Sequence, residues 1–290
     1  MTHKTFSVIG GDTRSAYLAA ALIRDGHTVY VNALEACGRL PEEALTEDVS
    51  TAIRRSDVVI LPMPLSADEV ILNAPLAHQP VFLADLFAAA SPHQLFVAGK
   101  VKPRLAAALK LRHITLLDYM QREELAIMNS IPTAEGALEL AMRLLPVTLF
   151  GCKTLVIGYG RIGKLLSANL RDLGASVTVS ARKQADFAWI RANRMTPADS
   201  TKLTAFVGGF DLIFNTAPAM MLEEAALGCC KPEVLIIDLA SVPGGVDFAV
   251  ANQLGRKAVA ALSLPGKVAP QTAAGIVKDT IINMISEETP

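Results

Sequence analysis

The sequence predicts an α/β protein made of two Rossmann-like domains, each a doubly wound parallel sheet, joined by a long helix. Short apolar runs alternate with amphipathic segments in both halves of the chain, which is the pattern of strands that alternate with helices. This pattern is interrupted near Asp118 by a long helical stretch, and the second half then opens on a glycine-rich turn. The last amphipathic segment follows the final strand, so we expect a C-terminal helix that crosses back to the first domain.

Residues 1–128 are predicted to form an N-terminal α/β domain on the substrate side of the protein. Its short apolar strands imply a parallel sheet that is covered on both faces. Pro62 and Pro64 end one strand in a rigid loop, at the carboxyl edge where open α/β sheets bind ligands. The expected strands are residues 6–10, 27–32, 57–61, 80–83 and 113–117, and the expected helices are residues 15–24, 49–55, 103–110 and 122–128.

Residues 129–150 are predicted to form the connecting helix. Ser130 or Thr133 can serve as its N-cap, with Pro132 nearby and Glu135 in the first turn. Residues 151–268 then repeat the alternation and are predicted to form the cofactor-binding Rossmann domain, and residues 269–290 form the C-terminal crossover helix. The expected strands of this half are residues 154–157, 176–180, 211–215, 234–239 and 257–261.

The turn after the first of these strands carries a dinucleotide-binding pattern. Gly158, Gly160 and Gly163 are spaced as G-x-G-x-x-G, with Arg161 and Ile162 between the last two. The first glycine permits the tight turn, the second lets the backbone approach a pyrophosphate, and the third lets the helix pack closely on the strand. The helix N-terminus then presents N–H groups to the phosphates. A turn without a ligand would not need three glycines in register, so we predict a nucleotide cofactor.

The end of the next strand indicates which nucleotide it is. NAD-binding domains usually place an acid here, but this chain has Ser180 followed by Ala181, Arg182 and Lys183, and the next acid is Asp186. A hydroxyl and a guanidinium suit a 2′-phosphate, which a carboxylate would repel. We therefore predict NADP rather than NAD. The alternative is that the two basic residues form an ordinary solvated strand end.

Composition excludes several classes of partner. The formal net charge of −1 gives no signal for nucleic-acid binding, and no stretch reaches the roughly 18 apolar residues that a membrane span needs. The chain has four cysteines and no C-x-x-C pair, and every histidine lies at or before His113, so no metal site is expected. The N-terminus leads directly into the first strand without a signal peptide, and we expect a cytoplasmic protein.

Six loops are expected to converge on the nicotinamide and the substrate. They are rich in glycine, proline, serine and threonine and poor in charge, which suits hydride transfer by a cofactor in a dry site. The second-domain loops are residues 215–218, 239–245 and 264–270, and the first-domain loops are residues 10–14, 62–64 and 129–136. The expected cofactor contacts from these loops are Thr216, Ala217, Pro218, Leu239 and Ala240.

Four charged groups in the loops are candidates for chemistry. Arg14 and Lys267 are the cations that could hold a carboxylate, and Asp12 and Glu135 are the acid/base candidates. The alternatives are a surface role for Arg14 at a helix start and a capping-box role for Glu135. The sequence does not choose the general base.

Two absences argue against simple 2-hydroxyacid chemistry. D-2-hydroxyacid dehydrogenases have a similar architecture but need a histidine near the end of the second domain, and this chain has none after His113. They also need an arginine near the position that Ser241 occupies here.

Seven motifs follow one another along the chain: GGDxR at residues 10–14, the proline loop at 62–64, NSIPTAEGA at 129–137, the glycine turn at 156–163, VTVSAR at 177–182, IIDLAS–PGG–DF at 236–248 and LPG–VAP–TA at 264–273. Taken together, these motifs resemble those of the dipicolinate synthase A subunits of spore-forming bacteria. The resemblance runs nearly end to end and in order. The DLAS–PGG segment is also similar to one in alanine dehydrogenases and transhydrogenases, which suggests a common origin of the second domain.

The resemblance implies that a dihydrodipicolinate is oxidised to pyridine-2,6-dicarboxylate during sporulation, with NADP+ accepting the hydride. It also implies a partner, the smaller flavoprotein-like B subunit of dipicolinate synthase, in a homo- or hetero-oligomer. A dianionic substrate needs cations and hydroxyl groups, for which Arg14, Ser130, Thr133 and Ser241 are the candidates. Two alternatives stay open: another NADP-linked dehydrogenase of an amino or imino acid, and a cofactor-binding regulatory protein without turnover. The role of the B subunit, the origin of the preceding dehydration and the oligomeric state are also open.

Overall fold

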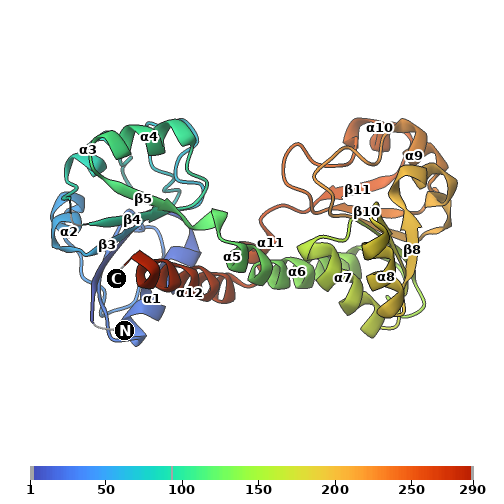
Figure 1. Cartoon of the computed structure of the whole chain (residues 1–290), viewed down its shortest axis with the longest axis horizontal. Helices are drawn as coiled ribbons and strands as arrows, with labels where there is room; N and C mark the ends of the chain where they lie inside the picture. The colour runs from blue at the N-terminus through green and yellow to red at the C-terminus, as the bar shows by residue number, and fades with distance from the viewer. Residues whose placement is uncertain (1–2, 93, 289–290) are drawn as a thin grey trace. The chain divides into compact units, whose positions relative to one another are not determined.

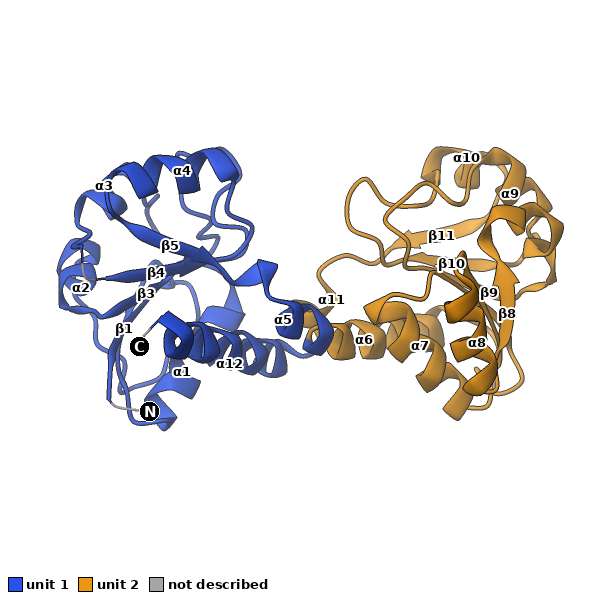
Figure 2. Cartoon of the chain, in the orientation of Figure 1, with its two compact units in different colours: residues 1–128, 269–290 blue, residues 129–268 orange. Residues whose placement is uncertain are grey.

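The computed structural model describes residues 3–92 and 94–288, and the chain divides into two compact units. Unit 1 comprises residues 1–128 and 269–290, and unit 2 comprises residues 129–268 (Figures 1 and 2). Each unit has its own parallel sheet with helices on both faces, which confirms the predicted fold class. Within the described residues, none of the helices has the length and apolar character of a membrane span.

The sheet of unit 1 has five strands in the order β2-β1-β3-β4-β5, and every pairing is parallel. Strand order reverses between β1 and β3, so this is where loops leave the carboxyl edge in opposite directions and a crevice opens. The strands are β1 (Thr5–Ile9), β2 (Thr28–Asn32), β3 (Val58–Ile60), β4 (Leu95–Ala98) and β5 (Thr115–Asp118).

Helices cover both faces of this sheet, which explains why its strands read as uninterrupted apolar runs. In β3, Val58 and Ile60 face one core while Val59 faces the other, and all three are buried. Helices α1 (Thr13–Arg24), α5 (Glu123–Met128) and α12 (Pro270–Glu288) contribute to the first core. Helices α2 (Val49–Arg55), α3 (Leu83–Ala88) and α4 (Pro103–Leu111) contribute to the second.

The C-terminal helix α12 returns to unit 1, which confirms the predicted crossover. It lies along α1 (red and blue in Figure 1), and its Ile281 is fully buried in the core that α1 shares. Arg122, which follows the 3₁₀ helix η1 (Tyr119–Gln121), binds both carboxylate oxygens of Glu287 at 2.6 and 2.7 Å. Residues from distant parts of the chain therefore complete one unit.

The sheet of unit 2 has six parallel strands in the order β11-β10-β9-β6-β7-β8. This is the Rossmann order, with its reversal between β6 and β9, where a dinucleotide crosses the sheet. The strands are β6 (Lys153–Ile157), β7 (Ser176–Ala181), β8 (Thr196–Asp199), β9 (Leu212–Asn215), β10 (Leu235–Asp238) and β11 (Lys257–Ala260).

Helices again cover both faces of the sheet in unit 2. One face packs on α6 (Ser130–Leu144), α7 (Arg161–Asp172), α8 (Gln184–Ala192) and α11 (Leu264–Val268). The other packs on the 3₁₀ helices η2 (Ser200–Ala205) and η3 (Val207–Gly209) and on α9 (Glu224–Cys229) and α10 (Phe248–Gln253).

Two sequence-based expectations about the elements are wrong, and two strands were not expected. Residues 80–83 form no strand, because Phe82 is the N-cap of α3 and makes only an isolated bridge with Ile71. The strand of this region is β4, four residues that were too short to stand out. The connecting helix begins at Ser130 with Asn129 as its N-cap, so neither Ser130 nor Thr133 caps it, and Glu135 lies beyond its first turn. Strand β8 was missed because it contains Pro197, which a sheet tolerates at its edge.

Candidate functional site

The turn between β6 and α7 gives each of its three glycines a different physical role. Gly158 has φ +98°, and a Cβ there would lie 2.6 Å from Thr216 Oγ1. A Cβ on Gly163 would collide with the carbonyl oxygen of Gly158, so only glycine lets the helix start this close to the strand. A Cβ on Gly160 would meet nothing within 4 Å. The middle glycine therefore borders open space, where a ligand can approach the backbone.

The N-terminus of α7 faces the same space. Gly160 is its N-cap and has no side chain to accept a hydrogen bond from the N–H groups of the first turn, among them those of Ile162 and Gly163. A 12-residue helix carries a partial positive charge at this end, and an anion is the natural partner for it. The turn therefore fits a pyrophosphate.

The loops after β9 and β10 form the neighbouring edge of the site. Thr216 donates its hydroxyl to the carbonyl of Ile157 at 2.9 Å and thereby ties the β9 loop to the end of β6. Ala217 is partly buried in the same loop, and Pro218 follows it. In the β10 loop, Leu239 and Ala240 are 6% and 5% exposed.

The strand end after β7 places the predicted phosphate-binding residues differently. Ser180 is fully buried, and its Oγ has no hydrogen-bond partner among the described residues. Ala181 is also buried and accepts a hydrogen bond from Ser200 through its carbonyl oxygen. Arg182 and Lys183 are exposed and lie just before α8, at the carboxyl edge of the sheet. Of these four residues, the two basic ones are accessible to a ligand.

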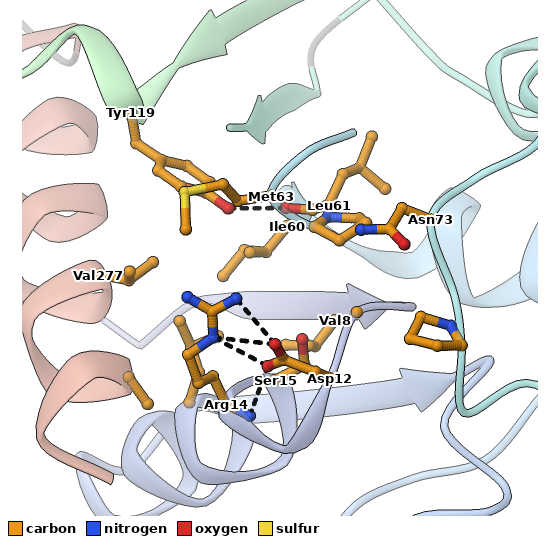
Figure 3. A pocket seen from close by; sticks show the side chains of 15 residues that line it. Val8, Asp12, Arg14, Ser15, Ile60, Leu61, Met63, Asn73, Tyr119 and Val277 are labelled. Atoms are coloured by element: carbon orange, nitrogen blue, oxygen red, sulfur yellow. Dashed lines mark hydrogen bonds and ion pairs between the residues drawn. The ribbon is translucent and has the colours of Figure 1, made fainter. Parts of the chain in front are cut away.

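Unit 1 has a pocket at its own strand-order reversal, between the carboxyl ends of β1 and β3 (Figure 3). Arg14 and Asp12 come from the β1–α1 turn, and Met63 comes from the loop after β3. Tyr119 from η1 and Val277 from α12 complete its walls. The pocket is mainly apolar with a few polar groups, as ligand sites are.

Arg14 and Asp12 form a bidentate ion pair in this pocket. Arg14 donates from Nε to both Asp12 oxygens at 2.9 and 3.1 Å, and from Nη2 to Oδ2 at 2.8 Å. Burial alone would raise the pKa of Asp12, but the hydrogen bonds and charge of Arg14 outweigh it and lower the pKa. Asp12 is therefore a weak proton acceptor. Within residues 3–92 and 94–288, the Nη1 of Arg14 makes no hydrogen bond and stays available as a donor.

The two units also differ in how the first helix after their first strand is capped, and Asp12 provides the cap in unit 1. Its carboxylate accepts a hydrogen bond from the backbone N–H of Arg14 at 3.0 Å and caps α1. The chain thus supplies its own anion at the N-terminus of α1, whereas the N-cap of α7 is a glycine. Gly11 is additionally covered, because its N–H donates to the carbonyl of Asn73. The N-terminus of α1 is therefore capped by a carboxylate, whereas the N-terminus of α7 has no side-chain cap.

Tyr119 is a pocket residue that the sequence reasoning missed. Its ring is buried, and its hydroxyl donates to the carbonyl of Leu61 at 3.3 Å. Burial raises the pKa of Tyr119 far above its usual value, so the phenol stays protonated. In Figure 3 the phenol and the guanidinium of Arg14 enter the pocket from different walls. Its position directly after β5 is the signal that could have identified it.

The remaining candidates all belong to unit 2. Ser130 and Thr133 are buried in the first turn of α6, and Thr133 donates its hydroxyl to the carbonyl of Asn129 at 2.8 Å. Glu135 is exposed on α6. Ser241 and Lys267 are exposed, in the β10 loop and on α11 respectively. Within the described part of the chain, no group of three or more histidine, cysteine or acidic residues could hold a metal ion.

The sequence reasoning also missed a buried polar pair under the unit 2 loops. Asn215 and Asp238, the last residues of β9 and β10, are 0% and 3% exposed and hydrogen-bond to each other at 2.8 Å. Both positions lie at strand ends next to motif loops, which is the signal that could have revealed them.

Comparison with known proteins identifies relatives of the whole chain. Residues 5–120 match the family model of the N-terminal domain of the dipicolinate synthase A subunit. The dipicolinate synthase A subunit of Bacillus subtilis (strain 168) is 30% identical over 289 residues, which cover 99% of this chain and 97% of the relative. The crystal structure of that protein superposes with a TM-score of 0.89, over 99% of this chain and 97% of the other at 30% identity.

Two further structures extend the comparison. The dipicolinate synthase A subunit of Bacillus halodurans matches with a TM-score of 0.87 and 28% identity, over 97% of both chains. A transhydrogenase of Sinorhizobium meliloti matches with a TM-score of 0.73 and 16% identity, over 98% of this chain and 94% of that one. The second likeness shows a shared fold.

Proposed function

The chain belongs to the family of dipicolinate synthase A subunits, and from this premise we propose that it is an NADP-dependent oxidoreductase that converts a dihydrodipicolinate to pyridine-2,6-dicarboxylate. When bound, NADP+ supplies the hydride acceptor. The substrate also loses one proton, and its ring becomes aromatic. Aromatisation provides driving force, so the protein has mainly to position the reactants and accept that proton.

The observation that carries the proposal is the glycine turn of unit 2. Open space over Gly160, and an N-cap of α7 without a side chain, make this a cradle for a pyrophosphate. Gly158 and Gly163 hold the turn in a shape that no larger residue permits. Thr216 and Ala217 from the β9 loop, and Leu239 and Ala240 from the β10 loop, are proposed to hold the nicotinamide half.

Preference for NADP over NAD is assigned to Arg182 and Lys183. Both are exposed at the carboxyl end of β7, and β7 ends without a carboxylate. A guanidinium binds phosphate in a fork, and a lysine adds charge. Because the side chain of Ser180 is buried, these two residues rather than the serine would contact a 2′-phosphate.

The substrate dianion is assigned to Arg14 in the pocket of unit 1. Asp12 holds Nε and Nη2, which fixes the guanidinium and leaves Nη1 for a substrate carboxylate. Since the lowered pKa of Asp12 makes it a weak proton acceptor, we propose the other candidate, Glu135, as the general base. Ser241 and Lys267 are exposed and are proposed as further substrate contacts, whereas Ser130 and Thr133 are buried in α6 and are not. The family name denotes one component of a complex, and we propose the flavoprotein-like B subunit as the partner.

The cofactor assignment is tested by titration with NADPH and NADH. Trp189, the chain's one tryptophan, is 63% exposed on α8, six residues after Lys183, and can report binding by energy transfer to the reduced cofactor. Wild type should bind NADPH more tightly. Arg182→Ala should weaken NADPH binding about tenfold or more and leave NADH binding unchanged. Arg191→Ala, in the last turn of α8, is the matched control and should change neither. Tighter NADH binding by wild type would overturn the assignment.

The reaction is tested with NADP+ and freshly made hydroxytetrahydrodipicolinate, with the B subunit present or omitted. Formation of NADPH and dipicolinate supports the proposed function, and its dependence on the B subunit locates the active site. Cofactor binding without turnover in either condition would favour a regulatory role. Turnover with an amino or imino acid alone would favour a different dehydrogenase.

A further inference from the structure

A buried carboxylate lies beneath the loops that follow β9 and β10. Asp238 is the last residue of β10 and is 3% exposed. Its Oδ1 accepts hydrogen bonds from Asn215 Nδ2 at 2.8 Å and from the N–H of Ala240 at 3.1 Å, and its Oδ2 accepts from the N–H of Gly245 at 2.9 Å. One side chain thus fixes both ends of the β10 loop, residues 239–245.

Asn215 connects this loop to the neighbouring one. It is the last residue of β9, is fully buried and pairs in register with Asp238. Besides its bond to Asp238, its Nδ2 donates to the carbonyl of Ala217 at 3.1 Å, and its Oδ1 accepts from the N–H of Ala217 at 3.3 Å. The two side chains therefore form a bridge between the β9 and β10 loops.

The packing around the bridge leaves little room for a side chain at Gly244 or Gly245. A Cβ on Gly245 would collide with Asn215 Nδ2 and would lie 2.7 Å from the carbonyl oxygen of Ala219. Gly244 has φ +85°, and its Cβ would lie 3.0 Å from Asp238 Oδ2. The backbone is thus pressed closely against the pair.

The bonding of Asp238 is entirely to N–H donors. Both oxygens accept, as those of a carboxylate do, and no lysine, arginine or histidine of the described residues forms an ion pair with it. A buried carboxylate is costly unless such donors satisfy it. Its hydrogen bonds to both ends of the β10 loop point to a role in shaping the loops.

We propose that Asp238 and Asn215 are positioning residues for the nicotinamide half of the cofactor. By bridging the two loops, they set the distance between residues 216–218 on one strand end and Leu239 and Ala240 on the next. Neither residue contacts the cofactor in this role. The inference rests on the proposed function, because it requires that these loops hold a nicotinamide dinucleotide.

The test compares Asp238→Asn with Asp211→Asn in the full-length chain. In Asp238→Asn an amide N–H faces a backbone N–H where an acceptor stood, so at least one bond of the bridge is lost. Asp211 is the matched control, since it lies just before β9 at the opposite edge of the same sheet and binds Lys231 and the N–H of Lys153. We expect the Kd for NADPH, followed through Trp189, to rise about 10- to 100-fold in Asp238→Asn. In Asp211→Asn it should stay within about threefold of wild type, because that carboxylate lies far from the loops.

Two readouts separate positioning from general stability. The KM for NADP+ should rise in Asp238→Asn while kcat at saturating NADP+ stays close to wild type. The second readout is a double variant, Asp238→Asn with Asn215→Asp, in which the two side chains are exchanged. It restores a hydrogen bond between them with donor and acceptor reversed, and should recover part of the affinity for NADPH.

Three results bear on the inference differently. If Asp238→Asn lowers the melting temperature but leaves the Kd unchanged, the pair is merely structural and the inference is overturned. Equal losses of affinity in Asp238→Asn and Asp211→Asn overturn it as well. If wild type binds neither NADPH nor NADH, the proposed function fails first, and that outcome is visible before any variant is made.

Discussion

Alanine substitutions at two glycines of the same turn should have opposite effects on folding and on binding. In Gly163→Ala the new Cβ would meet the carbonyl oxygen of Gly158, which belongs to the backbone and cannot swing away. Overpacking of this kind costs about 1–3 kcal/mol. In Gly160→Ala the Cβ meets nothing within 4 Å. The residue also has φ −81°, which alanine adopts readily, so folding should be nearly unchanged.

Cofactor binding should show the reverse order: Gly160→Ala should lose affinity although its folding is nearly unchanged. The Cβ of Gly160→Ala occupies the space through which a pyrophosphate reaches the start of α7, and at least one charge-assisted hydrogen bond should be lost. Such a bond contributes about 1.5–3 kcal/mol, which corresponds to about a 10- to 150-fold rise in Kd. Urea unfolding gives the stability of both variants, and energy transfer from Trp189 to NADPH gives the Kd. Wild-type affinity in Gly160→Ala would refute the assignment of this turn.

Three further predictions concern the pocket of unit 1. The folded-state pKa of Asp12 is lowered below 3.8, so its ion pair stabilises the protein above that pH and the contribution disappears as pH falls through the folded pKa. Asp12→Asn should therefore lower the free energy of unfolding by about 1 kcal/mol at most near neutral pH, given the partial exposure of the pair. Below the folded pKa the variant and wild type should be equally stable, and a constant difference across pH would contradict this. Arg14→Ala should raise the KM for the dicarboxylate about tenfold or more with no change in the Kd for NADPH, and an unchanged KM would remove Arg14 from the site. Tyr119→Phe should lower the free energy of unfolding by about 1 kcal/mol, measured in urea, because the Leu61 carbonyl loses a buried donor; unaltered stability would show that the 3.3 Å bond contributes nothing.

The parts of the fold that were predictable from the sequence are those with a strong local signal. The glycine turn follows a strand and opens a helix, and the spacing of glycines 158, 160 and 163 is typical of a dinucleotide-binding turn. The strand–helix alternation likewise reports parallel sheets, because strands buried on both faces must be apolar throughout. The short strand β4 and the proline-containing β8 lack that signal, and their pairing is decided by neighbours distant in the sequence.

The motifs of the site were predictable from the sequence, but the contacts between its side chains were not. Arg14 and Asp12 were both identified as candidates, yet a set of residues does not show that they neutralise each other. Ser180 has the right position along β7, but its side chain is buried because helices cover both faces of the sheet. Tyr119 reaches the pocket only because β5 lies beside β4 in the sheet, which is a tertiary fact.

The proposed oxidation is tested most directly by product stoichiometry. Purified protein, with the B subunit present, would be given NADP+ and hydroxytetrahydrodipicolinate, and NADPH and dipicolinate would be quantified in the same sample, with Gly160→Ala as the control. We expect equal amounts of the two products from wild type, and a rate in Gly160→Ala that is low until NADP+ is raised. Dipicolinate without NADPH, or NADPH without dipicolinate, would contradict it.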